Sequence, residues 1–139
     1  MREQFQEELD SVSATLVQMA GLVSVAMKNA TTALLTADLA LAEKVIADDL
    51  IIDEIQHELD ARTINLIARQ QPVASDLRTL VTSLRMSADL ERMGDLAHHV
   101  AKQARMRYPN SAVPAELIPT ITAMGLVADK IIDKQIGRA

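Results

Sequence analysis

The chain has 139 residues, of which 49% are hydrophobic and only 1% aromatic, and its formal net charge is -5. This length suits one ordinary domain, and the core must be built from Leu, Ile, Val, Ala and Met, which are mostly good helix formers. The acidic balance argues against a nucleic-acid-binding module, and the lack of cysteine excludes disulfides and thiolate metal sites. We therefore expect an all-α protein that binds no nucleic acid.

Nothing in the hydropathy pattern suggests a membrane segment. No apolar run approaches the roughly 20 residues that a membrane-spanning helix needs. The first ten residues, M-R-E-Q-F-Q-E-E-L-D, are acidic and lack the apolar centre of a signal peptide. We expect a soluble, cytoplasmic protein with no direct membrane span.

The first predicted helix extends from about Arg2 to about Leu35. Apolar residues recur along it at alternating spacings of four and three, the pattern of a helix that packs along one seam. This seam consists of Phe5, Leu9, Val12, Leu16, Met19, Val23, Ala26 and Ala30. Gly21 interrupts the helix, and we expect it to allow another helix to approach closely.

The second predicted helix begins after Asp38, a suitable N-cap, and extends to about Gln70. One column of apolar residues repeats in it every seven positions. The column consists of Val45, Ile52, Leu59 and Leu66. We expect this column to face the core.

The third predicted helix begins near Pro72, which suits a first helical position, and ends near Arg107. Leu77 and Leu84 lie in one seven-residue column, and we expect them to face the same core as the other two helices. Three long helices with tight connections predict an antiparallel three-helix bundle.

The segment Tyr108–Ala115, Y-P-N-S-A-V-P-A, reads as a linker, and a fourth helix is expected from about Glu116. The triplet Gly125-Leu126-Val127 repeats Gly21-Leu22-Val23. We therefore predict a three-helix repeat at residues 1–107, a linker at 108–115, and the first helix of an incomplete second repeat at 116–139. The apolar surface of that last helix predicts a homo-oligomer.

Two pairs of acids stand four residues apart on their helices: Asp49 and Asp53 on the second, Glu91 and Asp95 on the third. Both pairs are about 20 residues from the turn at Pro72, so an antiparallel hairpin would bring them to one level. Like charges at this spacing repel by a few tenths of a kcal/mol in an isolated helix. A hard multivalent cation would relieve the repulsion, because carboxylate oxygens suit such ions.

The residues around these acids leave two readings open. His98 and His99 could add a nitrogen ligand, and Arg92 could orient a carboxylate from outside a metal site. A solvated acidic face, in which neighbouring Arg and Lys side chains pair with the acids, is the commoner arrangement. The spacing alone favours the solvated face over a metal site.

Enzymatic function is not expected. Glu54 and His57 form an E-x-x-H, as in carboxylate-bridged di-iron bundles, but the first helix has no acid between Asp10 and Asp38 to complete such a centre. The sequence also contains no phosphate-binding loop, nucleophile elbow or zinc-protease motif. An oxidase and the common hydrolases are therefore disfavoured.

Four segments carry a family resemblance: M-R-E-Q-F-Q-E-E-L-D at the start, I-A-D-D-L-I-I-D-E at 46–54, A-R-Q-Q-P-V-A-S-D-L-R at 68–78 and D-L-E-R-M-G-D-L-A at 89–97. Together they resemble the PhoU family, called PhoY in some actinobacteria, which regulates phosphate uptake. The resemblance implies two three-helix repeats, each with an E/D-x-x-x-D motif able to hold a metal cluster on the bundle surface. This chain holds only one such repeat and part of the next.

On this chain the family motif falls on Glu91 and Asp95, and Asp49 and Asp53 match the acids that face it. The resemblance therefore favours bound divalent or ferric metal ions, namely Fe, Mn, Mg or Zn. It also implies a cytoplasmic, non-enzymatic adaptor between the ATPase of the phosphate ABC transporter and the sensor histidine kinase of the phosphate regulon, which signals repression when phosphate is plentiful. The alternative is a metal-free helical scaffold whose acids recognise a basic partner.

Overall fold

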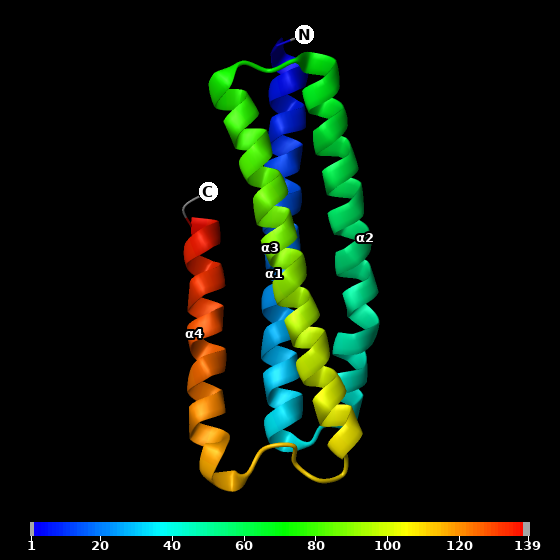
Figure 1. The fold of residues 1–139 in the computed structure, drawn as a ribbon, viewed down its shortest axis with the longest axis vertical. Helices are drawn as coiled ribbons and strands as arrows, with labels where there is room; N and C mark the ends of the chain where they lie inside the picture. Colours follow the sequence, from blue (N-terminus) through cyan, green and yellow to red (C-terminus); the bar gives the residue numbers. More distant parts are fainter. Residues whose placement is uncertain (1, 138–139) are drawn as a thin grey trace.

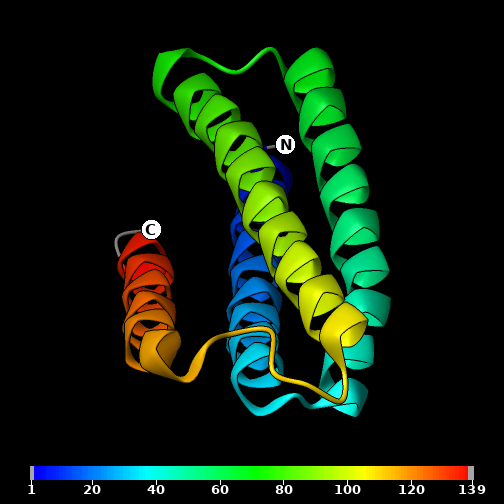
Figure 2. The ribbon, with the colours of Figure 1, turned by 60° about the horizontal axis from the view of Figure 1, so that its bottom comes forward.

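The computed structural model describes residues 2–137, which form a bundle of long helices. The elements are α1 Arg2–Thr36, α2 Leu39–Gln70, α3 Ala74–Arg107, the short 3-10 helix η1 Ala115–Leu117, and α4 Ile118–Gly137. Helices α1, α2 and α3 lie side by side in antiparallel order, and α4 runs along the outside of α1 (Figures 1 and 2). The predicted all-α bundle is confirmed.

The ends of α2 and α3 follow from local backbone chemistry. The Asp38 carboxylate accepts a hydrogen bond from the Leu41 N–H at 3.1 Å, as expected for an N-cap. Gln71 ends α2 in the left-handed region with φ 43°. Val73 is extended, so α3 begins at Ala74 and not at the predicted position near Pro72. The chain uses these intervening residues to cross from one helix axis to the next.

The seams predicted for α1 and α2 form the core. From Leu9 to Ala30, the α1 seam has exposed fractions of 8% or less, while Phe5 is partly buried at its end. In α2, the column from Val45 to Leu66 is exposed by 2% or less. Both predictions are confirmed. A helix that lies between two neighbours buries a continuous apolar stripe.

The buried face of α3 differs from the prediction. Leu77 is 38% exposed and Leu84 is only partly buried, so the expectation that this column faces the core is wrong. The residues that do face the core are mostly small and recur at heptad spacing: Leu80, Ser83, Ser87, Leu90, Gly94, Ala97, Ala101 and Ala104. A hydrophobicity pattern gives little weight to Ser, Gly and Ala, although small side chains are what allow α3 to lie close to α1 and α2.

The glycine at a close approach is Gly94 and not Gly21. A Cβ at Gly94 would lie 3.5 Å from Ile52 Cγ2 and 3.7 Å from Asp49 Oδ1, so α3 packs directly against α2 there. At Gly21, none of the described atoms of neighbouring elements comes within 4 Å of the corresponding position. The expectation of a close helix approach at Gly21 is therefore wrong.

Helix α4 is held by α1 alone among the described helices. Ser24 Oγ donates a hydrogen bond to Asp129 Oδ1 at 2.8 Å, Lys28 Nζ lies 3.4 Å from the same carboxylate, and Ile132 is fully buried. Gly125 packs against Thr31. The last two residues of the predicted 116–139 segment lie outside the described residues.

Helix α1 is also long and apolar enough to cross a membrane by length and composition. Its segment Glu3–Thr36 contains an 18-residue window with a mean hydropathy of at least 1.2, and it is the one such helix among the described residues. No apolar run in the sequence approaches about 20 residues, so α1 meets this test by its length and average composition only. The apolarity has a structural reason, because α1 is the helix that contacts each of the other three.

Candidate metal centre

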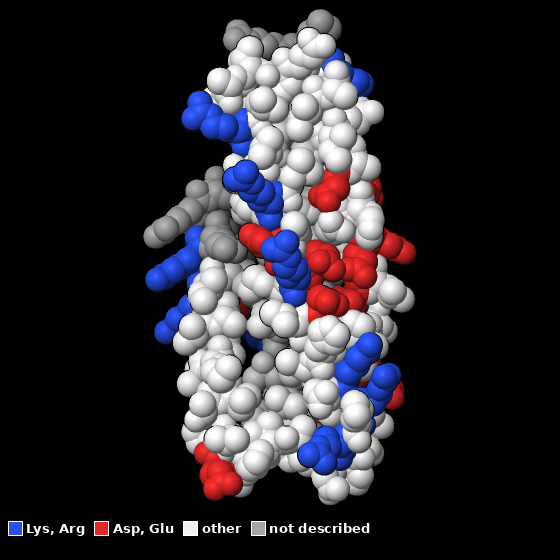
Figure 3. All heavy atoms as spheres, in the orientation of Figure 1, with Lys and Arg blue, Asp and Glu red and all other residues white. Residues whose placement is uncertain are grey.

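Acidic side chains gather at mid-height on one face of the bundle, over α2 and α3 (Figure 3). The contact between Gly94 and Ile52 sets this level, and it brings the two predicted acid pairs to the same height. Asp49 is buried, with an exposed fraction of 7%. Asp53 and Glu91 are partly buried, and Asp95 is exposed.

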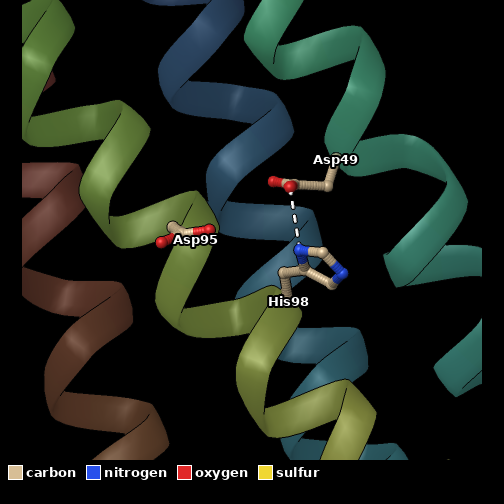
Figure 4. Close-up of side chains that lie close together, drawn as sticks. All are labelled: Asp49, Asp95 and His98. Atoms are coloured by element: carbon tan, nitrogen blue, oxygen red, sulfur yellow. Dashed lines mark ion pairs between the residues drawn. The ribbon is translucent and has the colours of Figure 1, made fainter.

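The most buried polar contact of this region joins Asp49 to His98. His98 Nδ1 lies 3.0 Å from Asp49 Oδ2, and both side chains are largely buried (Figure 4). His98 Nε2 is buried and has no hydrogen-bond partner among the described residues. Histidine therefore reaches across from α3 to the acid that α2 buries.

Asp95 completes a group of three side chains that could hold a metal ion. One potential ligand atom from each of Asp49, Asp95 and His98 lies within 4.8 Å of the others. Asp95 projects from α3 beside the Asp49–His98 pair (Figure 4). Two carboxylate oxygens and an imidazole nitrogen suit Fe, Mn or Zn.

Electrostatics link all four predicted acids. Burial is the main cause that raises the pKa of the Asp49 carboxyl, and the charges of Asp53 and Asp95 raise it further, although His98 opposes them. The pKa of Glu91 is raised by burial first and then by Asp53, Asp95 and Asp49. The pKa of a carboxyl group rises where burial and neighbouring negative charges disfavour its ionised form.

Arg92 and His99 lie outside the group formed by Asp49, Asp95 and His98. Arg92 pairs with Asp89 at 3.2 Å, on the exposed surface, and not with an acid of the predicted site. His99 Nε2 lies 3.5 Å from Asp95 Oδ2, also on the surface. The structure thus brings His98 inward and leaves His99 outside. The heptad spacing of the sequence distinguishes the two histidines. His98 follows Glu91 by seven residues and therefore lies on the same flank of the core face.

The fold and this site define a helical-bundle protein with a carboxylate-rich centre between two antiparallel helices. Comparison with known proteins identifies the family, because the model of the PhoU domain matches residues 16–104. The chain therefore belongs to the PhoU domain family, and the resemblance seen in the sequence is confirmed.

Named relatives are accessory proteins of phosphate-specific transport. The chain is 46% identical over 128 residues to phosphate-specific transport system accessory protein PhoU homolog 2 of Mycobacterium tuberculosis, covering 92% of this chain and 60% of that protein. It is 41% identical over 113 residues to the PhoU homolog of Rhizobium meliloti, covering 81% of this chain and 47% of that protein.

A solved structure shares the fold. The crystal structure of PhoU from Pseudomonas aeruginosa matches with a TM-score of 0.83 and 31% identity, covering 93% of this chain and 61% of that one. This chain therefore spans about 60% of the length of the mycobacterial relative and of the solved structure.

Proposed function

We propose that this chain is a metal-binding, cytoplasmic regulator of phosphate uptake and of the phosphate regulon. The observation that carries the proposal is the group formed by Asp49, Asp95 and His98, whose ligand atoms lie within 4.8 Å of one another on a PhoU fold. Asp53 and Glu91 would supply further oxygen ligands as ions are added.

Two properties of the site favour a cation. The raised pKa of Asp49 and of Glu91 shows that like charges and burial oppose ionisation there, and a bound divalent or ferric ion would reverse both effects. The helices also hold the ligands in place before binding, since Gly94 fixes the spacing of α2 and α3 beside Asp49. We propose Fe, Mn, Mg or Zn, with the nitrogen of His98 favouring Fe, Mn or Zn over Mg.

The regulator would act by binding and not by catalysis. Its proposed partners are the ATPase of the phosphate ABC transporter and the sensor histidine kinase, and the names of its relatives support the link to transport. Helices α1, α2 and α3 would form the first repeat at residues 1–107, and α4 at 116–139 would begin a second one. The functional form would be a homo-oligomer.

Elemental analysis of the purified protein tests the metal proposal. Asp49→Ala, and separately the double variant Glu91→Ala with Asp95→Ala, should lower the bound metal sharply while helical circular dichroism is retained. Asp48→Ala is the matched control, because Asp48 is next to Asp49 but pairs with Lys44 on the exposed face. Unchanged metal content in both site variants would refute the proposal.

A metal-free helical scaffold is the second candidate, and one contact favours it. His98 already offers Asp49 a partner at 3.0 Å, so the most buried acid does not require an ion. The exposed Asp95 would then belong to a recognition surface for a basic partner. Anomalous scattering at the carboxylates would separate the two, since only the metal-binding form gives a signal there.

A further inference from the structure

Two arginines lie seven residues apart on the side of α2 that contacts α1, and only one of them meets an acid. Arg69 Nη2 lies 3.0 Å from Glu8 Oε2. One heptad further along each of the two antiparallel helices, the corresponding residues are Arg62 and Thr15. At that level a hydroxyl group therefore stands where the neighbouring level has a carboxylate.

Arg62 is held only by neutral acceptors. Its Nη1 donates a hydrogen bond to Ser11 Oγ at 3.0 Å, and its Nη2 donates to Thr15 Oγ1 at 2.8 Å. The side chain is partly buried, its buried Nε has no hydrogen-bond partner, and it is in no ion pair within residues 2–137. A guanidinium cannot lose its proton in a protein, so its charge remains without a counter-charge.

The same side chains still have hydrogen-bond donors to offer. A guanidinium carries five N–H donors, and Arg62 uses two of them within the described chain. Thr15 donates its hydroxyl hydrogen to Ser11 O at 2.9 Å, whereas the Ser11 hydroxyl accepts from Arg62 and donates to no atom of the described residues. Unused donors from α1 and from α2 therefore lie around one uncompensated positive charge.

We propose that Arg62, Ser11 and Thr15 form a binding site for a small tetrahedral oxyanion, with inorganic phosphate as its simplest ligand. The planar guanidinium can pair with two oxygens of such an anion while the Ser11 hydroxyl donates to a third. Thr15 positions the guanidinium through its hydrogen bond to Nη2. Because the three side chains are only partly exposed between two helices, a small anion fits them better than a protein surface does.

This site goes beyond the metal-dependent role proposed above. It lies between α1 and α2, whereas the carboxylate centre lies between α2 and α3, and the two sites share no residue. Failure of one proposal therefore leaves the other intact, provided that the oxyanion is tested on metal-free protein.

A phosphate titration followed by nuclear magnetic resonance tests the site in the whole chain. The protein is first stripped of metal, the chelator is removed, and chloride keeps the ionic strength constant. The Arg62 Nε–H signal should shift saturably, with half-saturation at about 1–10 mM phosphate, and the Arg69 Nε–H signal should not. An Arg62 signal that does not saturate, or that follows the ionic strength in chloride alone, overturns the inference.

Thr15→Glu is the sharpest variant, because it supplies the missing carboxylate from the chain itself, as Glu8 does for Arg69. Phosphate affinity, followed through the backbone N–H signals around Ser11, should fall at least about tenfold. Arg62→Gln should abolish the saturable shift of the same signals. Arg69→Gln, on the same face of α2, is the matched control and should leave the affinity unchanged. Unchanged affinity in Thr15→Glu or in Arg62→Gln overturns the inference.

Acetate distinguishes a phosphate site from a contact for a carboxylate of another protein. Phosphate should bind several-fold more tightly than acetate at one ionic strength, because a tetrahedral anion can accept from both helices at once. Ser11→Ala removes the unused hydroxyl and keeps the guanidinium, so it should weaken phosphate binding several-fold and leave acetate binding unchanged. Equal affinity for the two anions, or an equal loss of both in Ser11→Ala, would overturn the assignment to a tetrahedral oxyanion.

Discussion

Helices α1 and α4 share a Gly-Leu-Val triplet and are both rich in apolar residues. They differ in how many of these apolar side chains are buried. Helix α1 contacts α2, α3 and α4, and Val23 of its triplet is fully buried. Helix α4 contacts α1, and Val127 of its triplet is 56% exposed. Sequence pattern marks the faces that can be buried, whereas the number of neighbouring helices decides which of them are.

The comparison also separates two kinds of energy. In the three-helix bundle, apolar side chains stabilise the fold of one chain by leaving water. On α4, the equivalent side chains can contribute to stability only when something else covers them. Substitutions in the three-helix bundle should therefore change the free energy of unfolding of the isolated chain, whereas substitutions on the exposed side of α4 should change it little.

The largest contrast is expected for truncation of one large side chain. Leu59→Ala, in the fully buried column of α2, should lower the free energy of unfolding by about 2–5 kcal/mol because it leaves a cavity. Val127→Ala should change the free energy of unfolding of the isolated chain by less than about 0.5 kcal/mol, as is usual at the surface. Denaturant unfolding at low protein concentration measures both. Similar costs for the two would mean that α4 is buried within its own chain.

A smaller contrast is expected at two packed glycines. An alanine methyl at position 94 would meet Ile52 and Asp49 at ordinary contact distances of 3.5–3.7 Å, so Gly94→Ala should gain about 0.5–1 kcal/mol of helix stability. At position 125 the methyl would lie only 3.1 Å from Thr31 Cγ2. Thr31 is β-branched and its hydroxyl is bonded to Met27 O at 2.8 Å, so it yields little room.

Gly125→Ala should therefore weaken the packing of α4 against α1. It should not show the increase in stability expected for Gly94→Ala. Hydrogen exchange resolves the two outcomes, since faster exchange is expected in α4 alone. Slower exchange throughout α4 in Gly125→Ala would contradict the close packing of Thr31 against this glycine.

The smallest effect concerns the carboxylate centre, which has no counterpart on α4. Because the pKa of Glu91 is raised in the folded state, its contribution to stability is present at low pH and is lost as the pH rises through that raised pKa. In metal-free protein, Glu91→Gln should therefore be more stable than the parent at neutral pH by a few tenths of a kcal/mol, about the size of one like-charge helix pair.

At acid pH, where Glu91 itself is protonated, the Glu91→Gln variant and the parent should have equal stability. Thermal unfolding across pH, with Glu7→Gln as the exposed control, measures this difference. A constant difference at every pH would show that Glu91 acts through packing and not through its charge.

Sequence reasoning predicted the helices and the level of the acids because both depend on local chemistry and chain length. Asp38 marks a cap, and the distance of Asp49 and Glu91 from one tight turn sets their common height. It failed on the core face of α3, where Leu77 is exposed and Ser87 is fully buried, because residue size and not hydrophobicity decides that face. It also left open which histidine turns inward, although the seven-residue spacing from Glu91 to His98 held that information.

The small core residues of α3 make the bundle asymmetric toward mutation. In α2, where the buried column is large, harm comes from making a side chain smaller, as with Leu59. In α3, a methyl fits at Gly94, but Ala97 and Ala101 are exposed by 1% or less, so enlarging either alanine should cost about 1–3 kcal/mol through overpacking. A substitution scan of this protein should therefore show opposite size preferences on the two facing helices. The core positions of α3 should accept small polar side chains, whereas the apolar column of α2 should not.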